Sequence, residues 1–445
     1  MNGSDRRTDA ACPRLAARDS LYTPVHVVEL ELDDPGELRS PGGQGPTDPD
    51  GRVLALVRLH GHPLGLVRAS GAPGDRAGLR RALVDAAHRD LAFTPTHTST
   101  TSSPATATPE ARPCRAGSAR APADALRVSV IVATHNRAGQ LRQCLDSLLR
   151  NGYPQLELIV VDNAPSSDEA RTLIRERYAG RVRYLREPVA GLARAHNTGL
   201  AAAHGEVCAF TDDDTLADPG WVAALAAAFA DDQRAGCVTG LILPAELDTP
   251  AQVALELHGG FAKGFTPRSW SLREPPADPL FPFAAGQFGS GANMAFRTAA
   301  LRRLGGFDPA MGTGTPARGG DDLLAFFRVL AAGYTLAYQP EAVIWHRHRR
   351  TPEAVPAQAF GYGAGFGAFL AAALAHEPAM LPELLRRLPQ GVGHAARRSH
   401  RDTGAPVHSG PDLGHLELRG LLYGPLGYLR SRVQAHRVRS HRHGE

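Results

Sequence analysis

The chain has 445 residues, 43% of them hydrophobic, which is enough for two or three domains with their own cores. Its formal net charge of +4 is too small for a protein that binds nucleic acid over its whole surface, so no nucleic-acid partner is expected. The five cysteines form no CxxC pair, which argues against a zinc ribbon or a disulfide framework and indicates reduced thiols. The polar N-terminus lacks the apolar core of a signal peptide, so we expect a cytoplasmic protein.

Residues 21–91 predict a small α/β accessory module without a chemical motif. An alternating strand over Val25–Leu32 is followed by a hairpin over Arg52–Val67. A helix is expected at Leu79–Leu91, after a start signal at Asp75. Two segments that cannot bury a core flank the module and are predicted to be disordered or flexible: residues 1–20 and the Ser/Thr/Pro-rich linker 92–126.

Residues 127–350 are expected to form one domain. In its first part, up to Phe210, apolar strands alternate with helices. The first four strands are predicted at Val128–Ala133, Leu156–Val161, Val182–Leu185 and Val207–Phe210. Such alternation predicts a parallel sheet covered on both faces, and ligands of these sheets bind at the carboxyl ends of the strands. Polar residues follow three of the four strands, which predicts a nucleotide pocket: Thr134, Asn136, Asp162 and the triplet Asp212–Asp214.

The acidic triplet Asp212–Asp214 stands at the end of a buried strand. Three adjacent carboxylates repel one another, and this is costly unless a cation or donor groups sit against them. The stretch by itself fits two interpretations equally well. Either it holds a metal ion that binds a diphosphate, or it is a solvated turn that caps the next helix.

The second half of this region is less regular. We expect a long loop over the site at residues 244–285 and an acidic pair, Asp321 and Asp322, at the start of a helix. Two short strands are expected at Tyr334–Tyr338 and Ala342–Trp345, with His346 directly after the second.

Residues 351–445 predict a helical, basic C-terminal region. Residues 354–375 are uncharged and long enough to span a bilayer, but their Ala/Gly-rich composition favours a buried or interfacial helix. The Arg- and His-rich residues 380–445 predict a solvated helical tail, with contact to anionic lipid headgroups as the alternative. That alternative would place the cytoplasmic protein peripherally at the inner face of the membrane.

Residues 128 to about 350 resemble the inverting family 2 glycosyltransferases, which have the GT-A fold. The resemblance lies in a set of short motifs that occur in the family's order: Val128-Ser-Val-Ile-Val-Ala-Thr-His-Asn-Arg137, Ile159-Val-Val-Asp-Asn163, Gly191-Leu-Ala-Arg194, Asn197-Thr-Gly199, Phe210-Thr-Asp-Asp-Asp214, Gly289-Ser-Gly-Ala-Asn293, Gly305-Gly-Phe-Asp308, Gly320-Asp-Asp322 and Trp345-His346. The fold class expected is therefore α/β, a GT-A domain with a small N-terminal α/β module and a helical C-terminal region.

The resemblance implies a nucleotide-diphospho-sugar donor, a divalent metal ion and a hydroxyl acceptor, which could be a glycan, a lipid-linked molecule or a small molecule. The metal would be Mg²⁺ or Mn²⁺, because both prefer oxygen ligands and accept phosphates in their shell. By similarity, Asp214 binds the metal, Asp212 binds the metal or the ribose, and Asp213 could share this work. His346 would complete the metal shell, with His348 as the alternative register.

Further roles follow from the same resemblance. Thr134 and Asp162 would hold the nucleoside, Arg194 would contact the nucleotide side, and Asn136 would join them or only shape the turn. Asp322 would be the general base that takes the acceptor proton, with Asp321 as its partner or substitute. Ordinary capping is the alternative for a pair of carboxylates at a helix start.

Two other functions compete with single-sugar transfer. A sugar-1-phosphate nucleotidyltransferase normally has a Gly-rich, Arg-containing loop after its first strand, and this sequence has Thr134-His-Asn-Arg137 there. A non-catalytic sugar-nucleotide-binding or scaffold protein would have no need to keep Asp162, Asp322 and His346 together with the acidic triplet. The sequence therefore favours a metal-dependent glycosyltransferase.

Overall fold

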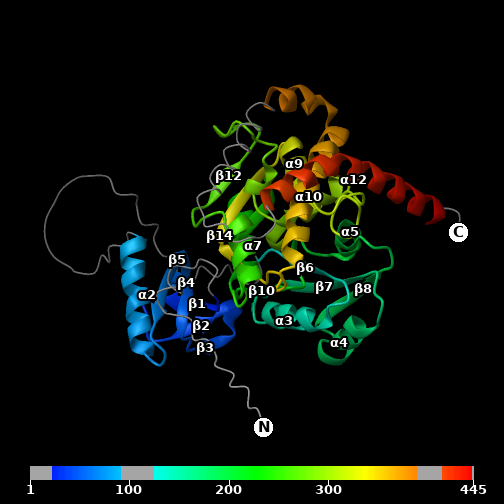
Figure 1. Cartoon of the computed structure of the whole chain (residues 1–445). Coiled ribbons are helices and arrows are strands. Elements are labelled where there is room, and N and C mark those ends of the chain that lie inside the picture. The colour runs from blue at the N-terminus through cyan, green and yellow to red at the C-terminus, as the bar shows by residue number, and fades with distance from the viewer. Residues whose placement is uncertain (1–22, 92–124, 388–412, 443–445) are drawn as a thin grey trace, which may run out of the picture.

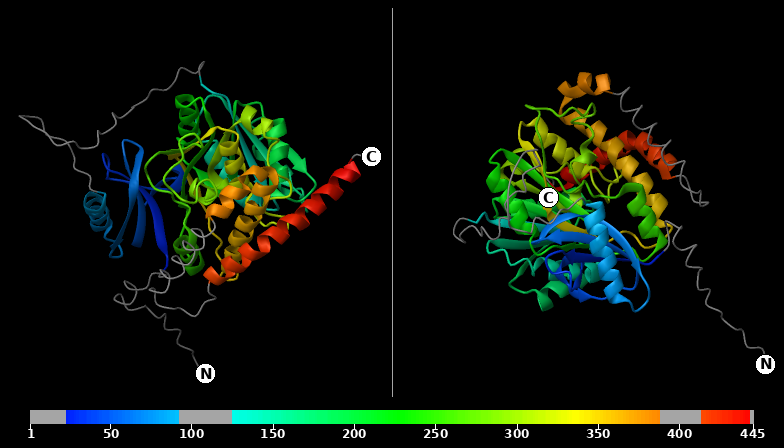
Figure 2. Two further views of the ribbon diagram at one scale, coloured as in Figure 1. Left: turned by 90° about the horizontal axis from the view of Figure 1, so that it is seen from above. Right: turned by 90° about the vertical axis from the view of Figure 1, so that its left-hand side faces the viewer.

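The structure is a computed structural model that describes residues 23–91, 125–387 and 413–442. The predicted disordered segment 1–20 and residues 92–124 of the predicted linker lie outside the described residues. The described part forms a five-stranded sheet near the N-terminus and a nine-stranded sheet after it (Figure 1). Figure 2 shows the small sheet and the last helix, α12, on opposite sides of the large sheet.

The small sheet has the strand order β3-β2-β1-β4-β5 and packs against one helix, α2. Its elements are β1 (Val25–Glu31), β2 (Leu38–Ser40), β3 (Gly45–Thr47), β4 (Gly51–Leu59), β5 (His62–Gly71) and α2 (Arg76–Asp90). The hairpin and the helix that the sequence predicts are both present. Asp75 caps α2, because its side chain accepts a hydrogen bond from the backbone N–H of Gly78.

The two sheets share part of their hydrophobic core. Val27 and Leu54, on the face of the small sheet that points away from α2, belong to the core cluster of the large sheet. At their border, buried Arg58 donates to Glu29 at 2.7 Å and to Asp218, just beyond the acidic triplet, at 2.5 Å. The N-terminal sheet is thus joined to the residue that follows β10, four positions after the acidic triplet.

The large sheet has the strand order β10-β14-β11-β13-β9-β6-β7-β8, and β12 pairs with β14 beside this path. The strands β9, β6, β7 and β8 are parallel, as predicted. β13 runs antiparallel to both its neighbours and β11 runs parallel to β14, so the second half of the sheet, for which the sequence predicted no strand direction, is mixed. The strands are β6 (Val128–Thr134), β7 (Leu156–Asn163), β8 (Val182–Glu187), β9 (Val207–Asp212), β10 (Thr215–Ala217), β11 (Ala235–Pro244), β12 (Arg268–Trp270), β13 (Met294–Arg297) and β14 (Thr335–His346).

Helices cover both faces of the large sheet, because its central strands are apolar on both faces. In β6, Val130 belongs to one core cluster and its neighbour Ile131 to the other. The first cluster includes residues of α3 (Ala138–Leu148), α4 (Glu169–Arg177) and α6 (Trp221–Asp231). The second includes residues of α5 (Leu192–Ala202), α8 (Thr298–Arg303) and α9 (Asp321–Ala331).

Residues 244–285 do not form one long loop, which corrects the expectation from the sequence. They contain α7 (Pro250–Gly259), whose start is fixed by a capping box between Thr249 and Gln252. The two short strands expected between Tyr334 and Trp345 are one continuous strand, β14. The register of β14 against β11 shifts between Gly240 and Leu241 of β11, opposite the gap expected between the two strands.

The C-terminal region is helical in its described part, as expected. It includes α10 (Ala354–His376) and α12 (Leu413–Arg442), which pack against each other. Small residues permit this close contact: a Cβ atom at Gly363 would lie 1.8 Å from the carbonyl oxygen of Glu417. Helix α10 is the one described helix long and apolar enough to cross a membrane, and half of its most apolar window is buried inside the protein.

Candidate active site

The carboxyl ends of three parallel strands bring the predicted polar residues to one edge of the large sheet. Thr134 at the end of β6 is paired with Asp162 at the end of β7. On the other side of β6, Ala133 is paired with Asp212 at the end of β9. The strand register therefore sets the nucleotide-binding candidates and the acidic triplet beside each other, as the βαβ pattern predicts.

A cleft of about 3650 Å³ lies over this edge. It is larger than the roughly 300–1,000 Å³ of a typical small-molecule pocket. Seven of the predicted site residues line it: Thr134, Asp212, Asp213, Asp214, Asp321, Asp322 and His346. Three do not belong to its lining: Asn136, Asp162 and Arg194.

Asp212, Asp214 and His346 form a compact group of potential metal ligands. One ligand atom of each lies within 4.8 Å of the others, and no other such group is found among the described residues. The arrangement follows from the antiparallel pairing of β10 with the end of β14, in which Thr215 is opposite His346. His346 Nε2 lies 3.4 Å from Asp214 Oδ1, whereas His348 is engaged by Glu256 at 2.8 Å.

The pKa shifts of Asp212, Asp214 and His346 differ in direction. Burial, and then the neighbouring Asp214 carboxylate, raise the pKa of Asp212 to about 7. Burial also opposes ionisation of Asp214, but His346 and then Arg137 outweigh it and hold the pKa of Asp214 at about 2. Burial lowers the pKa of His346, while the Asp214 carboxylate raises it and prevails.

The residues present fit a divalent cation. Asp214 Oδ1 and His346 Nδ1 are buried and have no hydrogen-bond partner, a costly arrangement for polar atoms. Two carboxylates and one imidazole are a donor set suited to Mn²⁺, and carboxylates alone suit Mg²⁺.

Asp213 belongs to a different set of contacts from its two neighbours. It accepts a hydrogen bond from the Thr134 hydroxyl at 2.7 Å and from the Arg137 guanidinium at 3.2 Å. The same nitrogen of Arg137 lies 3.2 Å from Asp214. Arg137 is the main residue that sequence reasoning missed on this side, although it ends the motif that Thr134 begins.

The three candidates outside the cleft lining have other surroundings. Asp162 is 1% exposed and accepts a hydrogen bond from the Tyr184 hydroxyl at 2.9 Å. Burial raises the pKa of Asp162 in spite of this bond. Asn136 accepts from the backbone N–H of Ser166 at 3.0 Å, and Arg194 lies in the first turn of α5. The structure therefore does not bring these residues into the cleft.

Asp321 and Asp322 occupy the first two positions of α9. Both oxygens of Asp322 accept backbone hydrogen bonds of 2.8 Å, one from Gly291 and one from Leu323. Burial, and then the neighbouring Asp321, nevertheless raise the pKa of Asp322 to about 6. A carboxyl group with this pKa can change its protonation state near neutral pH, which suits a general base.

Asp321 faces a buried histidine that the sequence did not single out. His196 Nδ1 lies 3.6 Å from Asp321 Oδ2, and neither ring nitrogen of His196 has a hydrogen-bond partner. The ring packs against Phe210 and Phe307 at centroid distances of 5.0 Å.

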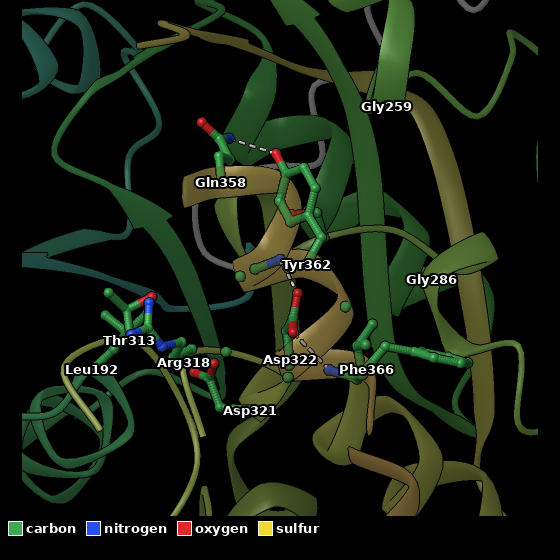
Figure 3. A pocket seen from close by; sticks show the side chains of 18 of the residues that line it. Leu192, Gly259, Gly286, Thr313, Arg318, Asp321, Asp322, Gln358, Tyr362 and Phe366 are labelled. Atoms are coloured by element: carbon green, nitrogen blue, oxygen red, sulfur yellow. Dashed lines mark hydrogen bonds between the residues drawn. The ribbon is translucent and has the colours of Figure 1, made fainter. Parts of the chain in front are cut away.

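One wall of the cleft near Asp322 is aromatic. Tyr362 and Phe366 of α10 lie close to Asp322 in Figure 3, and Gln358 donates a hydrogen bond of 2.6 Å to the Tyr362 hydroxyl. Phe261, after α7, packs edge-on against His346 with ring centroids 5.3 Å apart. These residues come from segments whose role the sequence did not reveal, because their convergence depends on how α7 and α10 pack.

Comparison with known proteins gives a family for the central part of the chain. The sequence profile described as glycosyl transferase family 2 matches residues 129–305. This segment is a glycosyl transferase family 2 domain. The match covers the strand ends and the acidic triplet of the family 2 domain. It stops before Asp321, Asp322 and His346 and does not test their roles.

Curated relatives of the family 2 domain carry glycosyltransferase names. The pre-mycofactocin glycosyltransferase of Mycobacterium tuberculosis is 29% identical over 226 residues, which are 50% of this chain and 43% of the relative. The probable glycosyltransferase YdaM of Bacillus subtilis is 25% identical over 51% of each chain. The chain thus spans about half the length of these relatives.

Among solved structures, a mannosyltransferase from Pyrobaculum calidifontis in complex with GDP-Man and Mn²⁺ is 21% identical. The similarity covers 69% of this chain and 88% of the mannosyltransferase, with a TM-score of 0.42.

Proposed function

We propose that the protein is an inverting, metal-dependent glycosyltransferase that moves one sugar from a nucleotide-diphospho-sugar to an acceptor hydroxyl. The observation that carries the proposal is that one cleft holds both the group of Asp212, Asp214 and His346 and the separate carboxyl group of Asp322. The first suits a cation that binds phosphates, and the second suits the acceptance of a proton.

On the donor side, Asp212, Asp214 and His346 would hold Mg²⁺ or Mn²⁺. A bound divalent ion supplies positive charge that stabilises a diphosphate leaving group. Thr134 and Arg137 would meet the nucleotide, and their position in the cleft lining beside Asp213 supports this role. Arg137 would exchange part of its contact with the carboxylates for the diphosphate.

On the acceptor side, Asp322 would act as the general base. The acceptor oxygen attacks the anomeric carbon, the bond from that carbon to the diphosphate oxygen breaks, and its electron pair leaves with the nucleotide. The hydroxyl proton moves to a carboxylate oxygen of Asp322. The backbone N–H groups of Gly291 and Leu323 hold that carboxylate in place, so little reorganisation is needed during the transfer.

Asp321 would keep a supporting role in this scheme. Its carboxylate raises the pKa of Asp322 and lies beside the unpartnered His196. The aromatic wall of Tyr362 and Phe366 offers apolar faces next to the base, which suits a sugar-like or partly apolar acceptor. The size of the cleft is consistent with donor and acceptor binding together.

The test is a panel of UDP-, GDP- and dTDP-sugars assayed for donor hydrolysis and for binding, with Mn²⁺, with Mg²⁺ and with EDTA. We expect turnover of at least one donor, lost with EDTA and restored by the metal. Binding of a donor without turnover under any condition would favour the scaffold function. Failure to bind any donor would contradict the proposal.

A further inference from the structure

The outer face of α12 exposes a row of large apolar side chains. Among the described residues, eight large hydrophobic side chains are exposed, and five of these lie on this helix. Their exposed fractions run from 47% to 74%, which is unusual for one helix of a folded domain. We call these five residues the leucine stripe: Leu418, Leu422, Leu426, Leu429 and Val433.

The leucine stripe is a continuous surface. At about 100° per residue, its members fall within an arc of about 80° on the helix. The opposite side of α12 is buried against the rest of the protein, as at Gly424, Tyr428 and Ala435. The stripe therefore points away from the packed face, and Figure 2 shows α12 along the outside of the molecule.

Arginine side chains border the leucine stripe. Arg419, Arg430 and Arg437 lie on one side of it and Arg432 on the other, and all four are exposed. Glu417 is the single acidic residue of α12, and His258 lies 3.5 Å from its carboxylate. An apolar row with positive borders on both sides is the pattern of a helix that lies in a membrane interface.

We propose that α12 docks the protein on an anionic lipid bilayer, with the leucine stripe among the acyl chains and the arginines at the lipid phosphates. A second copy of the chain fits this surface less well, because the borders of two such helices would bring arginine against arginine. A substrate in the cleft does not account for the stripe either, since Leu422, Leu426 and Leu429 do not line the cleft.

Docking in this way would bring the cleft close to the bilayer. Leu418 and Val433 of the leucine stripe also line the cleft, as does Arg430 beside the stripe. The proposal does not depend on the transferase activity, because it concerns the outer surface of one helix. It requires no insertion of α10, which remains packed inside the protein.

The experiment is co-sedimentation of the full chain with vesicles of phosphatidylcholine alone or of phosphatidylcholine mixed with phosphatidylglycerol. We expect binding to the anionic vesicles, at least about tenfold stronger than to the neutral ones and weakened by salt. The double variant Leu422→Gln/Leu429→Gln should lose about tenfold or more of this binding. Leu257→Gln, at a comparably exposed leucine on α7, is the matched control and should bind like the wild type.

The substituted side chains are exposed, so both variants should keep the wild-type Tm and circular dichroism spectrum. Equal vesicle binding by the double variant and the wild type would overturn the proposal. A wild type that did not bind anionic vesicles but formed a dimer, lost in the double variant, would also overturn the proposal. The leucine stripe would then join two copies of the chain.

Discussion

Two acidic sites face the same cleft and differ in what surrounds them. The carboxylates of the triplet meet basic side chains, because Arg137 lies 3.2 Å from both Asp213 and Asp214, and His346 lies 3.4 Å from Asp214. Asp322 meets only backbone N–H groups and a second carboxyl group. The pKa of Asp214 is accordingly held at about 2, whereas burial raises the pKa of Asp322 to about 6 and also that of Asp212, within the triplet, to about 7.

The difference between Asp214 and Asp322 corresponds to two kinds of chemistry that carboxylates perform. A carboxylate that stays ionised can hold a cation, and one whose pKa approaches neutrality can accept and release a proton. Residues of the same type thus acquire different roles from their neighbours.

The largest effect is expected from removing the proton acceptor. Asp322→Asn should lower the rate of transfer by about 10²–10⁴-fold, since a positioned general base contributes this much. Donor binding with metal should be unchanged, as measured by calorimetry. Asp231→Asn, an exposed carboxyl group at the end of α6, is the control for the change of residue type. Full turnover in Asp322→Asn, with loss in Asp321→Asn, would assign the base to Asp321.

The next largest effect concerns the two histidines at the end of β14. His346→Ala should weaken Mn²⁺ binding by on the order of 100-fold, because a direct ligand is lost. His348→Gln should leave Mn²⁺ binding as it is, since His348 contacts Glu256 instead of the acidic triplet. Titration of the purified protein with Mn²⁺ measures both. Equal loss in the two variants would mean that His346 acts only through packing.

The pH dependence of turnover follows from the raised pKa of Asp322. The base must be ionised to take a proton, so kcat/KM should rise about tenfold per pH unit below pH 6 and level off above it. In Asp322→Asn the residual activity should lose this slope. A wild-type profile that stays flat from about pH 5 to about pH 7 would show that no group with this pKa limits the reaction.

The smallest effect is expected at Arg137, whose side chain is 32% exposed. Arg137→Gln removes a cation that competes with the metal for Asp214, so Mn²⁺ binding without nucleotide should strengthen, by up to about fivefold. Donor binding should weaken at the same time, because the diphosphate loses a partner. Weaker binding of both ligands would indicate that Arg137 mainly keeps the triplet in place.

The central strands and the cleft edge could be predicted from the sequence because they depend on local pattern. A run such as Val128–Ala133 is apolar on both faces, and this is enough to indicate a buried strand and the position of its carboxyl end. The family motifs then assign Asp212–Asp214 to that edge. Which of these carboxylates group together was not predictable, because it depends on the pairing of β10 with β14 across more than a hundred residues.

Other parts of the site gave weaker signals. The capping box at Thr249 and Gln252 is a recognisable start of α7, yet the surrounding Pro-rich composition suggested a loop. His196 and Tyr362 carry no motif of their own, and their place in the cleft depends on the packing of α5 and α10. Arg137 lies within a recognised motif, but its partner Asp213 is 76 residues away, so the sequence did not indicate their contact.

The core shared by the two sheets bears on how the protein unfolds. Val27 and Leu54 of the small sheet lie in the same cluster as the strands of the large one, and Arg58 is buried between carboxylates from both. Separating the sheets would expose this apolar surface and take Asp218 away from Arg58, which would keep Glu29 of its own sheet as its carboxylate partner. The N-terminal sheet should therefore melt together with the family 2 domain in a single cooperative transition.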